Sequence, residues 1–183
     1  WFVAHLLVYA LGYALWRWLT QHSSFTDRIK LPVPTHRTIV TYVLALTLVT
    51  AVVRIWYPID RWVTLLVFPA EIAHLPQYVS LFVIGMMAYR GDWLRRLPTA
   101  TAMTWLGIGM VAAAGRYAII LPGGWEWLPA TLISSGLFRS LWEALICVGL
   151  CVGLLTLFRE MDNGRLGKLL SLMAGAAYAA YII

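Results

Sequence analysis

Charged residues are scarce in this chain of 183 residues. Asp, Glu, Lys and Arg together make up 12% of it, whereas soluble proteins carry about 25%. Hydrophobic residues account for 61%, well above the soluble norm of about 45–50%. A chain of this composition has too few charges to cover the surface of a soluble domain. It is therefore predicted to be a membrane protein.

Cysteine is nearly absent. The two cysteines, Cys147 and Cys151, lie four residues apart in one apolar run. On a helix this spacing leaves the two side chains roughly parallel, so we expect no disulfide between them. We interpret both as buried thiols, and two thiols without a third ligand nearby do not predict a metal site.

Acidic residues are fewer than basic ones, at 8 against 14. No basic run is interleaved with aromatic residues on a polar face, so nucleic acid is not a predicted partner. The chain also lacks the GxxxxGK[ST], GxGxxG, HExxH and GxSxG patterns. Phosphate-loop, dinucleotide-binding, zinc-protease and serine-hydrolase functions therefore have no support in the sequence.

Long apolar runs and aromatic residues are abundant. The ten Trp and nine Tyr fall mostly near the ends of these runs, where amphipathic rings favour the lipid headgroup level. Each run is long enough for a helix to cross or nearly cross a bilayer. The predicted fold is an all-α, polytopic helical membrane bundle of about six transmembrane helices. We expect crossings at residues 1–19, 38–56, 76–90, 99–121 and 137–158, and the start of a last one at 169–183.

Two stretches between the crossings are irregular. Residues 59–75 are apolar but short and are broken at Pro69, so we expect an interfacial or re-entrant helix there. Pro122 begins the second stretch, which ends near Gly136.

The basic residues give an orientation. Ten of the fourteen Lys and Arg residues lie in or beside the loops that follow the first, third and fifth crossings. Because cytoplasmic loops are enriched in Lys and Arg, these loops are predicted to be cytoplasmic. Both irregular stretches then lie on the outer side. The ten residues are Arg17, Arg28, Lys30, Arg37, Arg90, Arg95, Arg96, Arg159, Arg165 and Lys168.

Ionisable residues at membrane depth are the first candidates for a functional site, because they are costly to place there. Glu143 lies in the fifth crossing, four residues after Arg139 and on the same helix face. The two either form a local ion pair that seats the helix or line a polar cavity. Arg54 lies toward the outer end of the second crossing, where snorkelling to the interface would also explain it.

A second group of candidates lies at the outer mouth of the third crossing. His74, Gln77 and Tyr78 are clustered there, and Glu71 precedes His74 by three residues. A carboxylate beside an imidazole can orient a general base. The alternative is an interfacial histidine whose hydrogen bonds are satisfied. Elsewhere, a GxxxG pattern at Gly149 predicts close helix packing.

Five short motifs stand out along the chain. The richest is residues 74–98, HLPQYVSLFVIGMMAYRGDWLRRLP. The others are the WF…LL…Y opening at Trp1, the R-x-x-x-P turn at Arg54 and Pro58, the WE…LL..FR helix from Trp142-Glu143 to Arg159, and the AYxxYII ending at Ala177–Ile183. In sequence and in order, these motifs resemble those of the integral-membrane acyltransferase 3 family, in particular its branch similar to glucan biosynthesis protein C and its O-antigen acetylases.

The resemblance implies an O-acyltransferase of about ten crossings in the bacterial inner membrane. Such enzymes move an acyl group, commonly acetyl, from acetyl-CoA or another acyl-CoA onto a carbohydrate hydroxyl, with no bound cofactor. Residues 1–183 would be the carboxy-terminal two-thirds of that single membrane domain. The family's catalytic residues match positions upstream of residue 1, so this segment alone would be inactive. The candidates for substrate binding are Arg54, His74, Gln77, Tyr78, Arg139 and Glu143. The competing hypothesis is a glycan or lipid transporter, or a flippase, without covalent chemistry.

Overall fold

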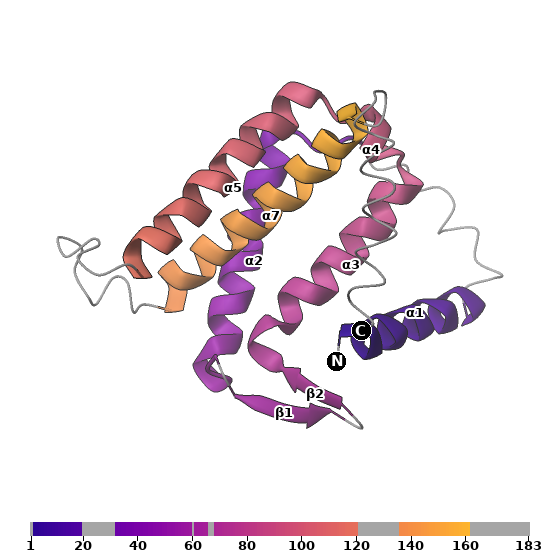
Figure 1. Cartoon of the computed structure of the whole chain (residues 1–183). Coiled ribbons are helices and arrows are strands. Elements are labelled where there is room, and N and C mark those ends of the chain that lie inside the picture. Colours follow the sequence, from indigo (N-terminus) through magenta and orange to yellow (C-terminus); the bar gives the residue numbers. More distant parts are fainter. Residues whose placement is uncertain (1, 20–31, 60, 66–67, 121–135, 162–183) are drawn as a thin grey trace, which may run out of the picture. The chain divides into compact units, whose positions relative to one another are not determined.

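The structure, a computed structural model, describes residues 2–19, 32–59, 61–65, 68–120 and 136–161 (Figure 1). Long helices dominate these ranges, which confirms the predicted all-α class. The elements in order are α1 (Phe2–Leu19), α2 (His36–Trp56), β1 (Trp62–Leu65), β2 (Phe68–Glu71), the 3-10 turn η1 (Ile72–His74), α3 (Leu75–Arg90), α4 (Trp93–Arg96), α5 (Thr99–Ile120) and α7 (Gly136–Met161).

The described residues divide into two compact units. The first unit contains α1, α2, the hairpin, α3 and the start of α7 as far as Ala144. The second unit begins at Leu94 and contains α5 and α7 from Leu145 onward.

Among the described residues, three helical segments are long and apolar enough to cross a membrane: α2, η1 with α3, and α7. The chain is therefore a membrane protein. The predicted first and fourth crossings are also helical, as α1 and α5. The predicted sixth crossing and the irregular stretch that starts at Pro122 lie outside the described residues.

The start of α2 shows how the sequence sets a helix boundary. Thr35 is the N-cap, and its hydroxyl accepts a hydrogen bond from the backbone N–H of Thr38 at 3.4 Å. Threonine is a favoured N-cap because its side chain satisfies one of the free N–H groups of the first turn. The helix consequently begins at His36, two residues before the predicted start.

The predicted helix over residues 59–75 is wrong. Strands β1 and β2 form an antiparallel hairpin, in which Trp62 pairs with Glu71 and Leu65 with Phe68. Aromatic and β-branched residues in β1 favour a strand, and Pro69 is tolerated in β2 because both strands of a two-stranded hairpin are edge strands. Only the last three residues before α3 are helical, as the turn η1.

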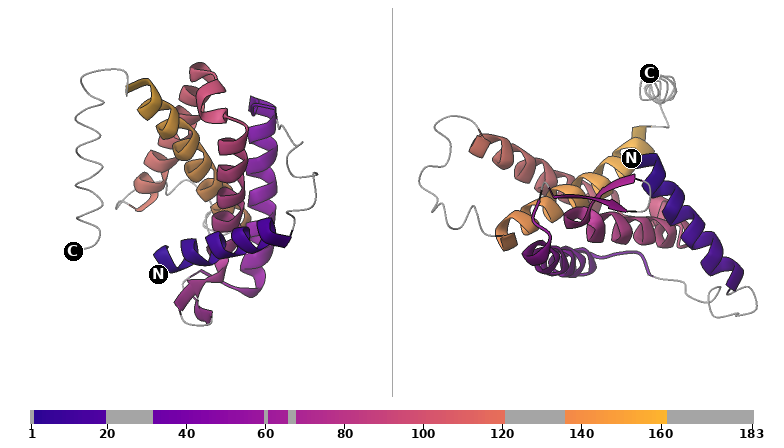
Figure 2. Two further views of the ribbon diagram at one scale, coloured as in Figure 1. Left: turned by 90° about the vertical axis from the view of Figure 1, so that its right-hand side faces the viewer. Right: turned by 90° about the horizontal axis from the view of Figure 1, so that it is seen from below.

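Helix α3 continues directly from η1 and has Pro76 in its first turn, a position where proline costs no hydrogen bond. It runs alongside α2 (Figure 2). The Tyr42 hydroxyl of α2 and the Ser80 hydroxyl of α3 are hydrogen-bonded at 2.9 Å. This bond fixes the register of the two helices near their middle.

In the second unit, α5 packs closely against α7 because glycines meet there. A Cβ atom on Gly149 would lie 2.6 Å from the carbonyl oxygen of Trp105 and 2.7 Å from Cα of Gly109, and one on Gly153 would lie 2.4 Å from Cβ of Leu106. The packing role predicted for the GxxxG pattern is confirmed. The interpretation of both cysteines as buried thiols is wrong for Cys151, which is exposed on α7.

Candidate functional site

A buried arginine lies at the end of a polar stripe on α2. Thr47, Thr50 and Arg54 follow one another at helical spacing on the same face, and all three are buried. The Arg54 side chain is only 5% exposed. The snorkelling to the interface that the sequence suggested for Arg54 is therefore not observed. A buried guanidinium must be paired, because an isolated charge in a low-dielectric interior is costly.

The partners of Arg54 come from two other elements of the first unit. Its Nη2 forms an ion pair with Oε2 of Glu143 on α7. Its Nη1 donates to Oγ of Ser140, one turn earlier on α7, at 3.0 Å. Its Nη2 also lies 3.4 Å from Nδ1 of His74 in η1. Residues 20 to 89 positions apart in the sequence thus meet at one guanidinium.

Glu143 holds two arginines. While Oε2 pairs with Arg54, Oε1 lies 3.4 Å from Nε of Arg139. The Arg139 side chain is 41% exposed and the Glu143 side chain 24%. The local pair with Arg139, the first alternative from the sequence, is therefore present, and the same carboxylate also belongs to a partly buried polar cluster.

His74 lies between two carboxylates. Its Nε2 is 3.6 Å from Oε1 of Glu71, and its Nδ1 is 3.9 Å from Oε2 of Glu143. The predicted pairing of Glu71 with His74 is confirmed, although the geometry comes from a strand end and a 3-10 turn and not from a helix. When Nδ1 accepts from Arg54, the neutral ring carries its proton on Nε2, facing Glu71.

We name Arg54, Glu71, His74, Ser140 and Glu143 the Arg54 cluster. Together with Arg139, the cluster holds two guanidinium groups, those of Arg54 and Arg139, and two carboxylates, those of Glu71 and Glu143. The charges therefore balance when His74 is neutral. The Arg54 Nε atom is buried and has no hydrogen-bond partner within the part of the chain that the structure describes. Arg54 thus has a free donor, which a bound oxygen atom would satisfy.

Gln77 and Tyr78 lie on the first turn of α3, beside the cluster but less directly in it. The Tyr78 ring lies 6.1 Å from the His74 ring and 6.3 Å from the His5 ring. Gln77 enters the described hydrogen bonds through its backbone carbonyl, which accepts from Ser80 Oγ at 3.2 Å. Of the six predicted residues, four meet around the Glu143 carboxylate: Arg54, His74, Arg139 and Glu143.

Ser140 is the cluster member that the sequence analysis missed. It is 1% exposed and lies three residues before Glu143 on α7. The signal was present, because residues three apart share a helix face. A serine in an apolar helix is nevertheless a weak signal without its partner on α2. The same holds for the stripe of Thr47 and Thr50 that leads to Arg54.

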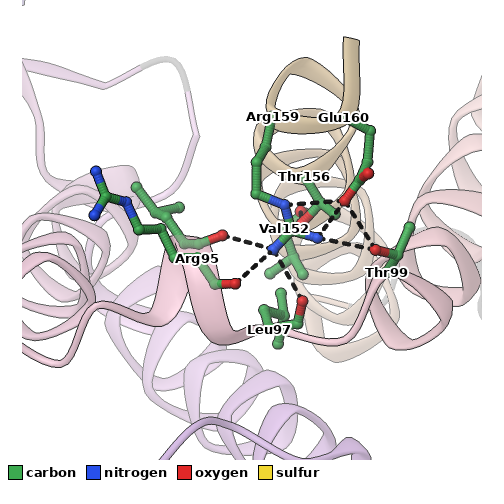
Figure 3. Close-up of polar contacts among 8 residues, drawn as sticks. Arg95, Leu97, Thr99, Val152, Thr156, Arg159 and Glu160 are labelled. Atoms are coloured by element: carbon green, nitrogen blue, oxygen red, sulfur yellow. Dashed lines mark hydrogen bonds and ion pairs between the residues drawn. The ribbon is translucent and has the colours of Figure 1, made fainter. Parts of the chain in front are cut away.

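A second arginine, Arg159, organises the second unit (Figure 3). Its Nη1 donates to the backbone carbonyls of Leu94 at 2.7 Å and Leu97 at 3.0 Å. Its Nη2 reaches the Thr99 hydroxyl at 2.9 Å and the adjacent carboxylate of Glu160 at 2.6 Å. Because its backbone partners lie in α4 and at Leu97 just after it, Arg159 is a structural clamp that holds α4 and the start of α5 on α7.

Among the described residues, no three His, Cys, Asp or Glu side chains are placed to hold a metal ion. Comparisons with protein-family models, with curated proteins and with solved structures found no match. The resemblance to the acyltransferase 3 family therefore rests on the motifs of this sequence alone.

Proposed function

We propose that this chain is part of a membrane-embedded O-acyltransferase that moves an acyl group, commonly acetyl, from acyl-CoA to a carbohydrate hydroxyl. The observation that supports it is the Arg54 cluster. Two of the short motifs that resemble the family, Arg54 with Pro58 and Trp142 with Glu143, lie far apart in the sequence, yet Arg54 and Glu143 form a partly buried ion pair. Motifs that matter only for helix insertion would have no reason to meet in this way.

The chemistry of the cluster suits the acceptor side of such a reaction. A carbohydrate hydroxyl needs hydrogen-bond partners that hold it at a fixed distance from the acyl carbon. The unsatisfied Nε of Arg54 supplies a hydrogen-bond donor, and His74 beside Glu71 supplies an oriented imidazole that can hydrogen-bond to the same hydroxyl. In this proposal the cluster binds and positions the sugar, and the catalytic residues lie upstream of residue 1. The whole enzyme lies in the bacterial inner membrane.

The test is acyl transfer in membranes that carry the full gene product. Radiolabelled acetyl-CoA is supplied, and label in the glycan fraction is counted. Arg54→Lys keeps the charge but loses the planar fork that reaches Ser140 and Glu143 together. We expect transfer to fall by roughly tenfold to a hundredfold, the range expected when a substrate-positioning contact is lost.

Arg139→Lys is the matched control, because Arg139 contacts the same carboxylate from an exposed position. We expect it to retain most of the transfer. Equal activity of Arg54→Lys and Arg139→Lys, at equal protein levels, would contradict the role of the cluster. Glycan or lipid that crosses the membrane without gaining label would favour the transporter or flippase.

A further inference from the structure

An apolar groove lies between α1 and α3 in the first unit, away from the Arg54 cluster. Its cavity has a volume of about 620 Å³ and is lined by aromatic and aliphatic side chains of both helices, among them Trp16, Phe82 and Met86. Its lining runs from Val8 to Trp16 on α1 and from Val79 to Arg90 on α3, which is about two turns of α1 and about three of α3. We name it the α1–α3 groove.

Contacts along the groove give the order in which residues of α1 meet residues of α3. On α1, His5, Tyr9 and Tyr13 come one turn apart. Tyr9 stacks against Phe82 with ring centroids 5.5 Å apart, and the Tyr13 hydroxyl accepts from Arg90 at 2.8 Å. The later residues of α1 therefore lie against the later residues of α3, and the groove has two chemically different ends.

The end formed by the last turns of both helices is cationic. The Arg90 guanidinium lies over the Tyr13 ring, 5.8 Å from its centroid. An adjoining cavity of about 750 Å³ contains Arg90 and Arg17. No Asp or Glu of the described chain lines either cavity. Two guanidinium groups thus face one mouth of an apolar groove with no carboxylate in its lining.

The described chain buries little of α3. Only 6% of the apolar window of η1 and α3 is buried. Gly12 on α1 and Gly85 on α3 line the two cavities, and a Cβ atom on either glycine would meet nothing within 4 Å. The groove is therefore open space beside a membrane-spanning helix, where lipid is the surrounding solvent.

We propose that the α1–α3 groove binds an anionic phospholipid. One acyl chain lies along the aromatic and aliphatic lining, and the phosphate lies at Arg90 and Arg17. Charge complementarity favours this occupant, since an apolar slot with a doubly cationic mouth matches a hydrocarbon chain with an anionic head. The distribution of Lys and Arg along the chain puts this mouth in the cytoplasmic leaflet, which carries the anionic lipids. The inference does not depend on the proposed acyl transfer.

The test is lipid binding to the purified full gene product, counted by native mass spectrometry. Phosphatidylglycerol is titrated against phosphatidylcholine with the same acyl chains. We expect about tenfold tighter binding of phosphatidylglycerol, because each basic residue near an anionic headgroup adds to the attraction. The double variant Arg17→Gln/Arg90→Gln should bind both lipids equally.

A plug in the groove tests the acyl-chain part separately. Gly12→Leu projects a side chain into open space, so we expect it to fold normally and to weaken binding of both lipids. Gly107→Leu on α5 is the matched control, because Gly107 also has open space around it and lines neither cavity. Its lipid binding should equal that of the natural chain.

Several binding results would overturn the proposal. They are equal binding of the two lipids by the natural chain, unchanged selectivity in the arginine double variant, unchanged binding in Gly12→Leu, and full competition by inorganic phosphate at the lipid's own concentration. Crosslinking from position 12 to another polypeptide segment would assign the groove to protein. Lipid binding without acyl transfer would contradict only the proposed function. Acyl transfer without lipid binding would contradict only the lipid proposal.

Discussion

Two arginines organise the two units of this chain in different ways. Arg54 in the first unit is 5% exposed and contacts side chains from two other elements. Arg159 in the second unit is 25% exposed and donates mostly to backbone carbonyls near its own helix end. Arg54 is a buried charge whose only carboxylate partner is Glu143 among the described residues. Arg159 is a clamp that has several partners, so the loss of one leaves the others in place.

The helices around the two arginines are also joined differently. In the first unit, α2 meets α3 and α7 through polar side chains, such as the bond of Tyr42 with Ser80. In the second unit, α5 meets α7 through glycine backbone at Gly109 and Gly149. Polar side chains of this kind can also form hydrogen bonds to a ligand, whereas glycine contacts bring only backbones together. This difference places the candidate site in the first unit.

The largest effect on stability should come from Glu143→Ala. It leaves the Arg54 guanidinium buried without its carboxylate, which typically costs about 3–5 kcal/mol. Thermal unfolding in detergent, followed by circular dichroism, measures the loss. Glu160→Ala removes the carboxylate beside Arg159 and is the control, for which we expect only a small change. Equal losses in the two variants would remove the distinction between the arginines.

Gly149→Leu should have the next largest effect, in the second unit. Its side chain would collide with the Trp105 carbonyl and with Gly109, and overpacking of this kind costs about 1–3 kcal/mol. The same unfolding measurement applies. Gly107→Leu is the control: it makes the same substitution on α5, the partner helix, at a position where the side chain meets no neighbour. A stable Gly149→Leu protein would mean that α5 and α7 are not held by close glycine contact.

The smallest effect should come from Arg159→Lys. Lysine keeps the charge but cannot donate to Leu94, Leu97 and Thr99 at once. The Leu94 carbonyl is exposed and can bind water instead, so we expect a loss of about 1–2 kcal/mol. Arg96→Lys on α4 is the exposed control and should leave unfolding unchanged. A loss as large as that of Glu143→Ala would show that Arg159 is as indispensable as the Arg54 cluster.

Most helix positions were predictable because apolar runs and caps act locally. The predicted starts and ends of four crossings fall within three residues of α2, α3, α5 and α7. Residues 59–75 were not predicted correctly, because a short apolar run carries no periodicity that separates a strand from a buried helix. There the aromatic and β-branched residues and Pro69 decided the outcome.

The sequence by itself determined that this is an all-α membrane chain, because composition and run length depend only on residue type. It also singled out Arg54, His74 and Glu143, since ionisable residues in apolar runs are rare. Only the tertiary structure decided that the three residues meet, that Ser140 joins them, and that α1 and α3 enclose a groove with a cationic mouth. Contacts between residues as far as 89 positions apart depend on how the helices pack. The residues on one helix face do not specify which other helix packs against it.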